Sequence, residues 1–294
     1  MATIEKVLDL LRIERGASFS LGAVAPGDTC GVEMSKKEAQ SRLAEEWLTR
    51  LTQLQERLYA QDRWALLVIL QGMDAAGKDG VIKHVMSGVN PQGCQVTSFK
   101  VPSAEELDHD FLWRTTRALP ERGRIGIFNR SYYEEVLVVR VHPAVLARQK
   151  LPPELVGPDI WRQRFEDIAA FERYLTRNGT VVLKFFLHMS RQEQRRRFLE
   201  RLETPEKRWK FAIGDVVERR HWDDYMAAYE EMIRHTASPH APWFVVPADH
   251  KWFARLVVAA ALVTALENLQ LEFPVLDEAQ GAELEEARRQ LLAE

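Results

Sequence analysis

The chain has 294 residues, a formal net charge of −3 and an apolar fraction of 46%, an ordinary composition for a protein with a large buried core. Its longest apolar stretch, residues 256–266, is far shorter than the roughly 20 residues that span a bilayer, which argues against a membrane protein. Cys30 and Cys94 have neither metal-ligand spacing nor the pattern of a disulfide framework. Because residues 1–15 also have no signal-peptide core, we expect a cytoplasmic protein.

The first two segments of the chain differ in regularity. In residues 1–35, glycine and proline interrupt any regular pattern, and we expect an irregular N-terminal arm there. Residues 35–61 place apolar side chains at helical spacing, and Ser35 with Glu38 resembles a capping box. This pattern predicts a long amphipathic helix that opens the main domain, which we assign to residues 36–273.

An apolar run of strand length, residues 64–71, leads into a glycine-bounded loop that ends in Gly77-Lys78 and precedes a helical pattern. A strand, Gly-x-x-x-x-Gly-Lys and a helix, in this order, are the context of a phosphate-binding P-loop. The glycines let backbone N–H groups approach phosphate oxygens, and the helix N-terminus and Lys78 add positive charge. The residues expected to contact phosphate are Gly72, Ala75, Ala76, Gly77, Lys78, Asp79 and Gly80.

Two acidic residues make this loop unusual. Asp79 stands where a common P-loop has a Ser or Thr for magnesium, and Asp74 lies inside the loop. A carboxylate that faces phosphates repels them unless a metal lies between, and Mg²⁺ prefers one or two carboxylates with phosphate and water oxygens. We therefore expect Asp74 to bind Mg²⁺, directly or through water, with Mn²⁺ as an alternative metal. The other interpretation makes Asp74 a solvent-facing turn residue beside a chance pair of glycines.

Strands continue to alternate with helices after the loop. The predicted strands, several of them continuously apolar as buried parallel strands are, cover residues 95–99, 124–128, 180–187 and 243–246. The predicted helices after the loop helix cover residues 103–119, 132–141, 159–178, 190–202 and 252–269. This order predicts an α/β, three-layer P-loop kinase fold with a parallel central sheet flanked by helices and a helical lid. An acidic C-terminal tail, residues 274–294, follows, in which residues 282–292 have a helical pattern.

Polar residues stand directly after the strand 124–128, at the edge where an open α/β sheet places its site residues. Arg130 is a candidate for phosphate contact, and Asn129 occupies a position where many P-loop proteins have an acid for magnesium. We count Asn129 as a candidate ligand of metal or nucleotide and Glu134, on the next predicted helix, as a further candidate. The alternatives are a surface role for Arg130 and a merely solvated Glu134.

Residues 191–220 carry a second concentration of positive charge. Acids in this stretch are fewer than cations, and like charges four residues apart on a helix repel, so the cations cannot all be paired internally. Beside a P-loop, such a segment is typical of a lid that closes on a polyanion during phosphoryl transfer, and we place the lid at about residues 191–222. A solvated basic helix and a nucleic-acid surface are the alternatives. The lack of a recognised readout motif argues against nucleic acid as a partner.

Four sequence motifs resemble the family-2 polyphosphate kinases, and they occur in order at similar spacing. They cover residues 72–80, 88–91, 128–142 and 205–210, and the resemblance extends from the helix before the P-loop to the last apolar helix. The form Asn129-Arg130-Ser131 is similar to the class III subgroup, whereas other subgroups commonly have Asp in place of Asn.

The resemblance implies reversible transfer of a phosphoryl group from inorganic polyphosphate to AMP or ADP with Mg²⁺, so that AMP is carried through to ATP. It implies that Lys78 and Arg130 hold and activate the transferred group, that Asp74 binds the metal, and that Arg197 contributes from the lid helix. It also implies a homodimer or homotetramer. Contacts to polyphosphate are also expected from Arg197 and from the lid residues Arg201, Lys207, Arg208 and Lys210.

The nucleotide pocket is the least defined part of the predicted site. Its candidates lie just beyond the P-loop helix, after the strand 124–128, or in the lid, and they are Asn90, Phe99, Lys100, Asn129, Glu134 and Asp215. The first alternative function is an ATP-dependent nucleoside monophosphate kinase. An alternative from another class is a nucleotide-switched regulatory or RNA-binding protein.

Overall fold

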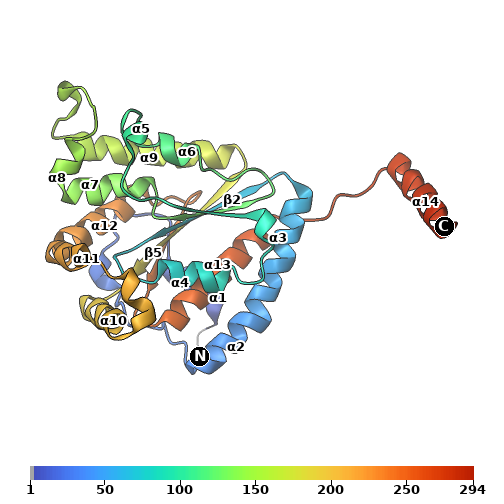
Figure 1. Ribbon diagram of the computed structural model, residues 1–294, viewed down its shortest axis with the longest axis horizontal. Coiled ribbons are helices and arrows are strands. Elements are labelled where there is room, and N and C mark those ends of the chain that lie inside the picture. Colours follow the sequence, from blue (N-terminus) through green and yellow to red (C-terminus); the bar gives the residue numbers. More distant parts are fainter. Residues whose placement is uncertain (1–2) are drawn as a thin grey trace.

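A six-stranded sheet lies between two layers of helices in the computed structural model, which describes residues 3–294 (Figure 1). The strands lie in the order β1-β6-β5-β2-β4-β3; β2 to β6 run parallel, and β1 is antiparallel to β6. This arrangement confirms the predicted α/β fold with a parallel central sheet. The strand bounds are β1 Arg12–Ile13, β2 Ala65–Gln71, β3 Cys94–Ser98, β4 Ile125–Asn129, β5 Thr180–His188 and β6 Trp243–Pro247.

The helices divide between the two faces of the sheet according to where their apolar side chains lie. One face is covered by α1 (Ile4–Leu11), α3 (Thr49–Gln61), α4 (Lys78–Val85) and α13 (Lys251–Glu267). The other face is covered by α9 (Ile160–Arg177) and α12 (Trp222–Thr236). The predicted long helix before β2 is formed by α2 (Lys36–Arg42), a π-helical segment and α3 in succession.

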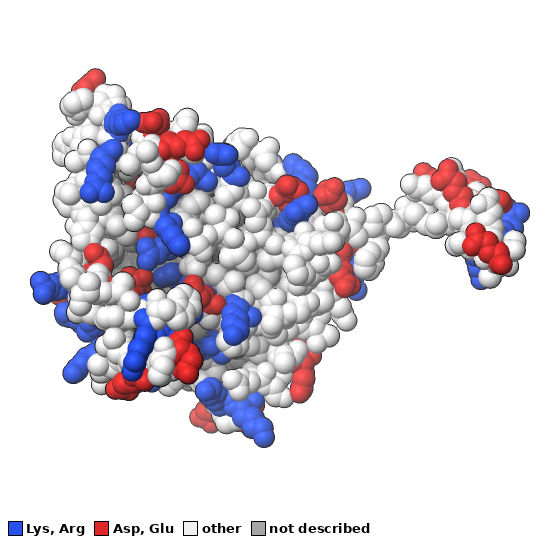
Figure 2. Space-filling model, viewed as in Figure 1, with Lys and Arg blue, Asp and Glu red and all other residues white. Residues whose placement is uncertain are grey.

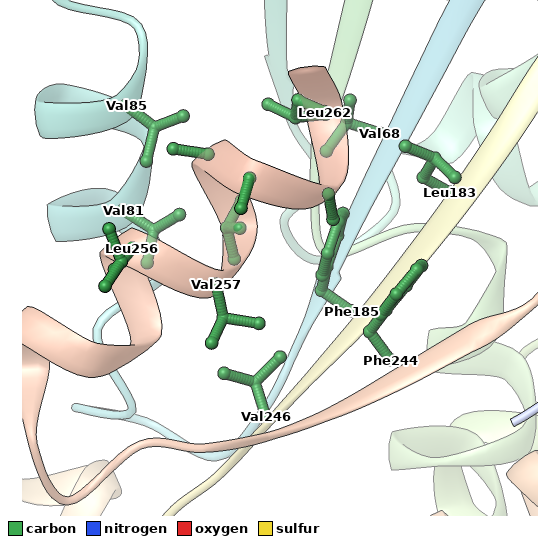
Figure 3. Packing of buried hydrophobic residues seen from close by; sticks show 14 of the residues in the cluster. Val68, Val81, Val85, Leu183, Phe185, Phe244, Val246, Leu256, Val257 and Leu262 are labelled. Atoms are coloured by element: carbon green, nitrogen blue, oxygen red, sulfur yellow. The ribbon is translucent and has the colours of Figure 1, made fainter. Parts of the chain in front are cut away.

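The apolar stretch near the C-terminus forms the buried helix α13. Figure 3 shows Leu256 and Val257 of this helix packed toward α4 and the sheet, where Phe185 and Phe244 stack with ring centroids 5.2 Å apart. Because α13 packs against both α4 and α3, the P-loop helix is fixed from behind by the largest apolar cluster. Within residues 3–294, the helices all fall short of the length and apolar character that a membrane crossing requires.

The prediction of an irregular arm over residues 1–35 is wrong for residues 4–13. These residues form α1, whose buried stripe includes Val7 and Leu11, and β1, which pairs with β6. The two-residue strand depends on its partner in the sheet and has no sequence pattern of its own. Residues 16–34 are largely irregular as expected, and Gly16 packs so closely on α12 that a Cβ would lie 2.4 Å from the carbonyl oxygens of Ile233 and Arg234.

Two predicted helices are broken. In place of one helix over 103–119, the chain forms α5 (Ala104–Leu107) and α6 (Trp113–Thr116), because the Asp110 carboxylate accepts the Leu112 N–H and turns the chain between them. In place of one helix over 132–141, a 3₁₀ turn (Tyr132–Val136) precedes α7 (Val138–Val141), with α8 (Pro143–Leu146) after it.

The lid and the tail complete the chain. The lid consists of α10 (Arg191–Glu203), a 3₁₀ segment (Pro205–Lys210) and α11 (Ile213–Glu218). The tail carries α14 (Glu278–Leu292), so the helical pattern noted in residues 282–292 is confirmed. Figure 1 shows α14 standing apart from the rest of the described chain at the end of an extended segment.

The buried position of α13 gives a stability prediction. Leu256 is 1% exposed in the cluster behind the P-loop helix, whereas Leu10 on α1 is 68% exposed. We expect Leu256→Ala to lower the free energy of unfolding by about 2–5 kcal/mol, because the cavity it leaves is lined by side chains that cannot fully collapse. Leu10→Ala is the matched control and should change it by less than about 0.5 kcal/mol in urea titrations. Equal effects would contradict the assigned core.

Candidate active site

The P-loop lies at the carboxyl edge of the sheet, between the end of β2 and the start of α4 at Lys78. Gly72 has φ +155°, and a Cβ there would lie 3.0 Å from the Leu187 carbonyl oxygen, so this position requires glycine. Gly77 has φ +110° and Ala75 has φ +66°. The predicted strand, loop and helix are therefore present in the predicted order.

Lys78 folds back over its own loop. Its Nζ donates to the carbonyl oxygens of Gly72 at 2.6 Å and Met73 at 3.3 Å, and the side chain is buried. Burial lowers the pKa of Lys78, and the nearby charge of Arg130 lowers it further, while the carboxylates around it act in the opposite direction. The ammonium group of Lys78 is thus held by the loop backbone, where it can bind an anion that enters the loop.

Arg130 and Asp74 face each other across the edge of the sheet. Nη2 of Arg130 lies 2.7 Å from Oδ1 of Asp74, and Nη1 lies 3.5 Å from Oε2 of Glu134. The Glu134 carboxylate raises the pKa of Arg130, and burial raises the pKa of Glu134 although Arg130 opposes this. The structure therefore brings together four residues that the sequence singled out: Lys78, Asp74, Arg130 and Glu134.

Asn129 lies beside the start of α4. Its Nδ2 donates to Oδ1 of Asp79 at 2.7 Å, so the amide links the end of β4 to the P-loop helix. This contact directs the Asp79 carboxylate toward β4. Asp79 is expected to contact phosphate through its backbone, which is compatible with this side-chain position.

The residues around Asp74 suit a magnesium ion. Among residues 3–294 there is no group of three or more His, Cys, Asp or Glu side chains that could cage a metal, but Mg²⁺ needs only one or two carboxylates when phosphate and water oxygens complete the shell. Arg130 binds one of the two oxygens of Asp74. Burial raises the pKa of Asp215, and the charge of Asp74 raises it further. This donor set fits a divalent cation shared with phosphates.

Arg197 on α10 holds the P-loop from behind. Its Nη1 donates to the carbonyl oxygens of Ala75 and Ala76, both at 2.9 Å. Its Nη2 donates to those of Ala248 at 2.6 Å and Asp249 at 3.0 Å, and its Nε donates to Glu193 at 2.7 Å. These contacts use all five N–H donors of a guanidinium group. In this structure Arg197 therefore binds protein groups with all its donors, and the phosphate contact expected of it is not present.

Gln194 is a site residue that the sequence analysis missed. Its Nε2 donates to the Asp74 carbonyl oxygen at 2.9 Å, and its Oε1 accepts from Arg219 at 2.7 Å. It therefore connects the P-loop to the far end of the lid. Its spacing three residues before Arg197 places it on the same face of α10, and this was the signal available in the sequence.

The lid cations are partly paired within the lid. Lys207 lies 2.5 Å from Glu200, Arg201 lies 3.7 Å from Asp215, and Arg208 donates to the Leu202 carbonyl oxygen. Lys210 lies over the ring of Trp209, 5.0 Å from its centroid. Figure 2 shows Lys and Arg, with some Asp and Glu among them, over the part of this face where α10 and α11 lie, whereas the middle of the face carries few charges. The lid thus presents a cationic surface at the P-loop edge of the sheet.

A cavity of about 230 Å³ opens beside Arg130, between the α5–α6 region and α7–α8. Phe99, Lys100 and Glu134 line it, as the prediction of a nucleotide pocket requires. The sequence analysis missed other lining residues, among them Arg114 and Val138 in the two broken helices and Arg148 and Gln149 in the connection after α8. Phe99 is itself 7% exposed and packs edge-on against Phe128, so it supports the wall of the cavity.

Asn90 does not belong to this site. It precedes β3, and it caps the turn Pro91–Gly93 by accepting the Gln92 N–H at 3.0 Å. Because β3 is parallel to β4, the residues before β3 lie at the amino edge of the sheet, opposite to the P-loop. The prediction that Asn90 contacts the nucleotide is therefore wrong.

The parallel sheet carries a P-loop, an arginine and a carboxylate at its carboxyl edge, and a cationic lid lies beside them. These features together define a P-loop phosphotransferase. The sequence pattern of the family Polyphosphate kinase 2 (PPK2) matches residues 33–274. The chain belongs to this family.

Three similar proteins illustrate the relationship. The ADP-polyphosphate phosphotransferase of Rhodopseudomonas palustris is 55% identical over 87% of this chain and 89% of its own length. The AMP/ADP-polyphosphate phosphotransferase of Meiothermus ruber is 46% identical over 90% of this chain and 94% of its own length. The crystal structure of polyphosphate kinase 2 from Arthrobacter aurescens superimposes with a TM-score of 0.88 at 40% identity, covering 100% of this chain and 98% of that one.

The contacts of Arg197 give a prediction about the loop. We expect Arg197→Ala to lower kcat by about 10²-fold or more, because four backbone carbonyls lose their donors and a misplaced site costs this much. Arg196→Ala is the matched control: Arg196 is its neighbour, binds the same Glu193 and is 61% exposed, and its loss should change kcat less than about 3-fold. Steady-state rates normalised to folded protein provide the measurement. Similar kcat values for both variants would show that the P-loop does not need the contacts of Arg197.

Proposed function

We propose that this protein transfers a phosphoryl group from inorganic polyphosphate to AMP and ADP, reversibly and with Mg²⁺. The observation that carries the proposal is the convergence of Lys78, Arg130 and Asp74 at the P-loop beside a cationic lid. Membership of the polyphosphate kinase 2 family and the names of the relatives from R. palustris and M. ruber support the choice of substrates. The same family resemblance supports a homodimer or homotetramer.

The side chains act by positioning and by stabilising charge, since phosphoryl transfer asks little covalent chemistry of the protein. Backbone N–H groups of the P-loop and the Lys78 ammonium group hold the oxygens of the donor phosphates. Arg130, kept in place by Asp74 and Glu134, stabilises the charge on the group in transfer. When bound, Mg²⁺ neutralises charge on the phosphate oxygens, and Asp74 would hold it. The class III-like Asn129 would act near the metal or nucleotide.

The lid side chains extend the phosphate-binding surface beyond the P-loop. A polymer of phosphates needs cations along its length, and the end of α10 and the 3₁₀ segment after it carry Arg201, Lys207, Arg208 and Lys210. Their pairing with Glu200 and Asp215 is compatible with exchange for phosphate, because exposed ion pairs contribute only about 0–1 kcal/mol. Asp215 does not line the cavity beside Arg130, so its expected contact with the nucleotide stays a prediction.

The cavity beside Arg130 is the proposed position of the acceptor nucleoside. Its walls are mostly apolar, and polar groups from Arg114, Arg148 and Gln149 stand among them, as in pockets that bind small ligands. Arg130 and Glu134 form the end of the cavity that faces the P-loop. A nucleotide bound here would direct its phosphates toward Arg130.

The test of this function omits ATP. Protein, Mg²⁺, AMP and polyphosphate should yield ADP and then ATP, measured by chromatography of the nucleotides. Lys78→Ala should lower the rate by about 10²–10³-fold, because it removes a charge that stabilises the transferred group. Absence of product from AMP and from ADP, in a preparation that phosphorylates AMP when ATP is supplied, would replace the proposal with an ATP-dependent nucleoside monophosphate kinase.

The position of the acceptor pocket gives a separate prediction. Val138→Phe would fill part of the cavity of about 230 Å³, so we expect KM for AMP and ADP to rise about 10-fold, the size of effect that a pocket clash typically has. KM for polyphosphate should stay within about 2-fold. Val156→Phe, at an exposed position of the loop before α9, is the control and should leave each constant unchanged. A rise in the polyphosphate KM instead would place the polymer in this cavity.

A further inference from the structure

Lys184 is a charged residue in the middle of an otherwise apolar strand. It lies on β5, level with Ile69 of β2 and Trp243 of β6, and its side chain is 0% exposed. Its Nζ donates to Oε2 of Glu172 at 2.6 Å, to the Tyr133 hydroxyl at 3.0 Å and to the Thr236 carbonyl oxygen at 2.8 Å. All three donors of the ammonium group are thus used in the core.

Glu172 on α9, which binds Lys184, also accepts hydrogen bonds from two tyrosine hydroxyl groups. Its Oε1 accepts the hydroxyl groups of Tyr132 at 2.9 Å and Tyr133 at 2.7 Å. Burial raises the pKa of both tyrosines, and the Glu172 charge raises it further, so both hydroxyl groups keep the protons that they donate. One carboxylate and one ammonium group therefore fix the hydroxyl groups of two consecutive residues.

Stability alone gives little reason for such a pair. The cost of removing two charges from water is commonly as large as their attraction, and apolar side chains of similar volume often serve as well. A fully bonded network in a low dielectric does, however, impose a single geometry on the groups it joins. The groups joined here belong to the segment that directly follows Arg130.

This segment is a tight turn that is held at several points. Arg130 has φ +65°, a left-handed conformation that side chains other than glycine seldom adopt. The Ser131 hydroxyl accepts the Tyr133 N–H at 3.1 Å and the amide of Gln71 at 3.2 Å. The Arg130 N–H donates to the Leu70 carbonyl oxygen at 3.1 Å. Without fixed anchors after it, the turn could relax and carry the guanidinium group away from Asp74.

We propose that Glu172 and Lys184 are positioning residues of the phosphotransfer reaction. They hold the hydroxyl groups of Tyr132 and Tyr133 and so fix the left-handed turn that directs Arg130 toward Asp74. The inference rests on the proposed function, because its readout is transfer from polyphosphate to AMP. It concerns two buried residues, one on β5 and one on α9, that take part in none of the contacts with phosphate or nucleotide proposed above.

The first test compares Tyr133→Phe and Glu172→Gln with Ile168→Ala, a buried substitution on the same helix α9. We expect the two network variants to lower kcat per folded molecule by about 10-fold or more, since small misplacements of a catalytic group are costly. KM for AMP and for polyphosphate should stay within about 3-fold. Ile168→Ala should lower the melting temperature at least as much but keep the wild-type kcat. Should Glu172→Gln not fold, Tyr132→Phe, which removes one hydroxyl group and keeps the ring, takes its place.

A double-mutant cycle with Arg130→Lys makes the test specific. If the network acts through the Arg130 guanidinium, Tyr133→Phe should lower kcat/KM in the Arg130→Lys background by less than about 2-fold, because the group that it positions is already gone. Full multiplication of the two effects, or a wild-type kcat for Tyr133→Phe, would overturn the inference. Lack of any transfer by the wild-type protein would instead overturn the proposed function.

Discussion

The structure depends on the way the P-loop backbone is oriented. For the loop to turn its N–H groups toward an anion, some of its carbonyl groups must point backward, and buried carbonyl groups need donors. Arg197 supplies these donors to Ala75 and Ala76 and, with its other nitrogen, to the two residues that follow β6. One buried guanidinium group thereby joins the phosphate loop, the lid helix and the carboxyl edge of the sheet. Because the Arg197 side chain belongs to the lid helix and binds the P-loop backbone, the lid and the P-loop form one connected unit.

The sequence predicted the parts of the site whose signals are local. The P-loop could be predicted because a strand, a glycine-bounded loop and a helix follow one another directly, and Arg130 because it ends an apolar strand. The back contacts of Arg197 could not be predicted, since counting charges does not show which way a side chain points. The placement of Asn90 failed for a geometric reason: an eight-residue helix carries the chain roughly 12 Å back across the sheet, to its other edge.

Helices and strands whose formation depends on residues far away in the chain also could not be predicted from the sequence. β1 has two residues and exists because β6 offers an edge, so residues 12 and 13 have no strand pattern of their own. The helix expected over 103–119 is divided where the Asp110 carboxylate binds the backbone, and the helix expected over 132–141 is divided at Leu137, whose φ of −114° and ψ of −87° are not helical. Arg114 and Val138, which line the cavity beside Arg130 and were not predicted, lie in these broken segments. Lys184 was visible only as an interruption of an apolar strand, whereas its partner Glu172 comes from a helix.

The tail helix α14 has a practical consequence. Phe273, Val275 and Leu276 in the connection to it are all more than half exposed, and the helix itself stands clear of the body (Figure 1). Such a connection is open to proteases, whereas the strands and helices around the phosphate loop are not. A cut there would release a short acidic peptide and leave the P-loop, the lid and the cavity beside Arg130 in one piece. The same separation makes this end of the chain a suitable place for an affinity tag or a surface tether.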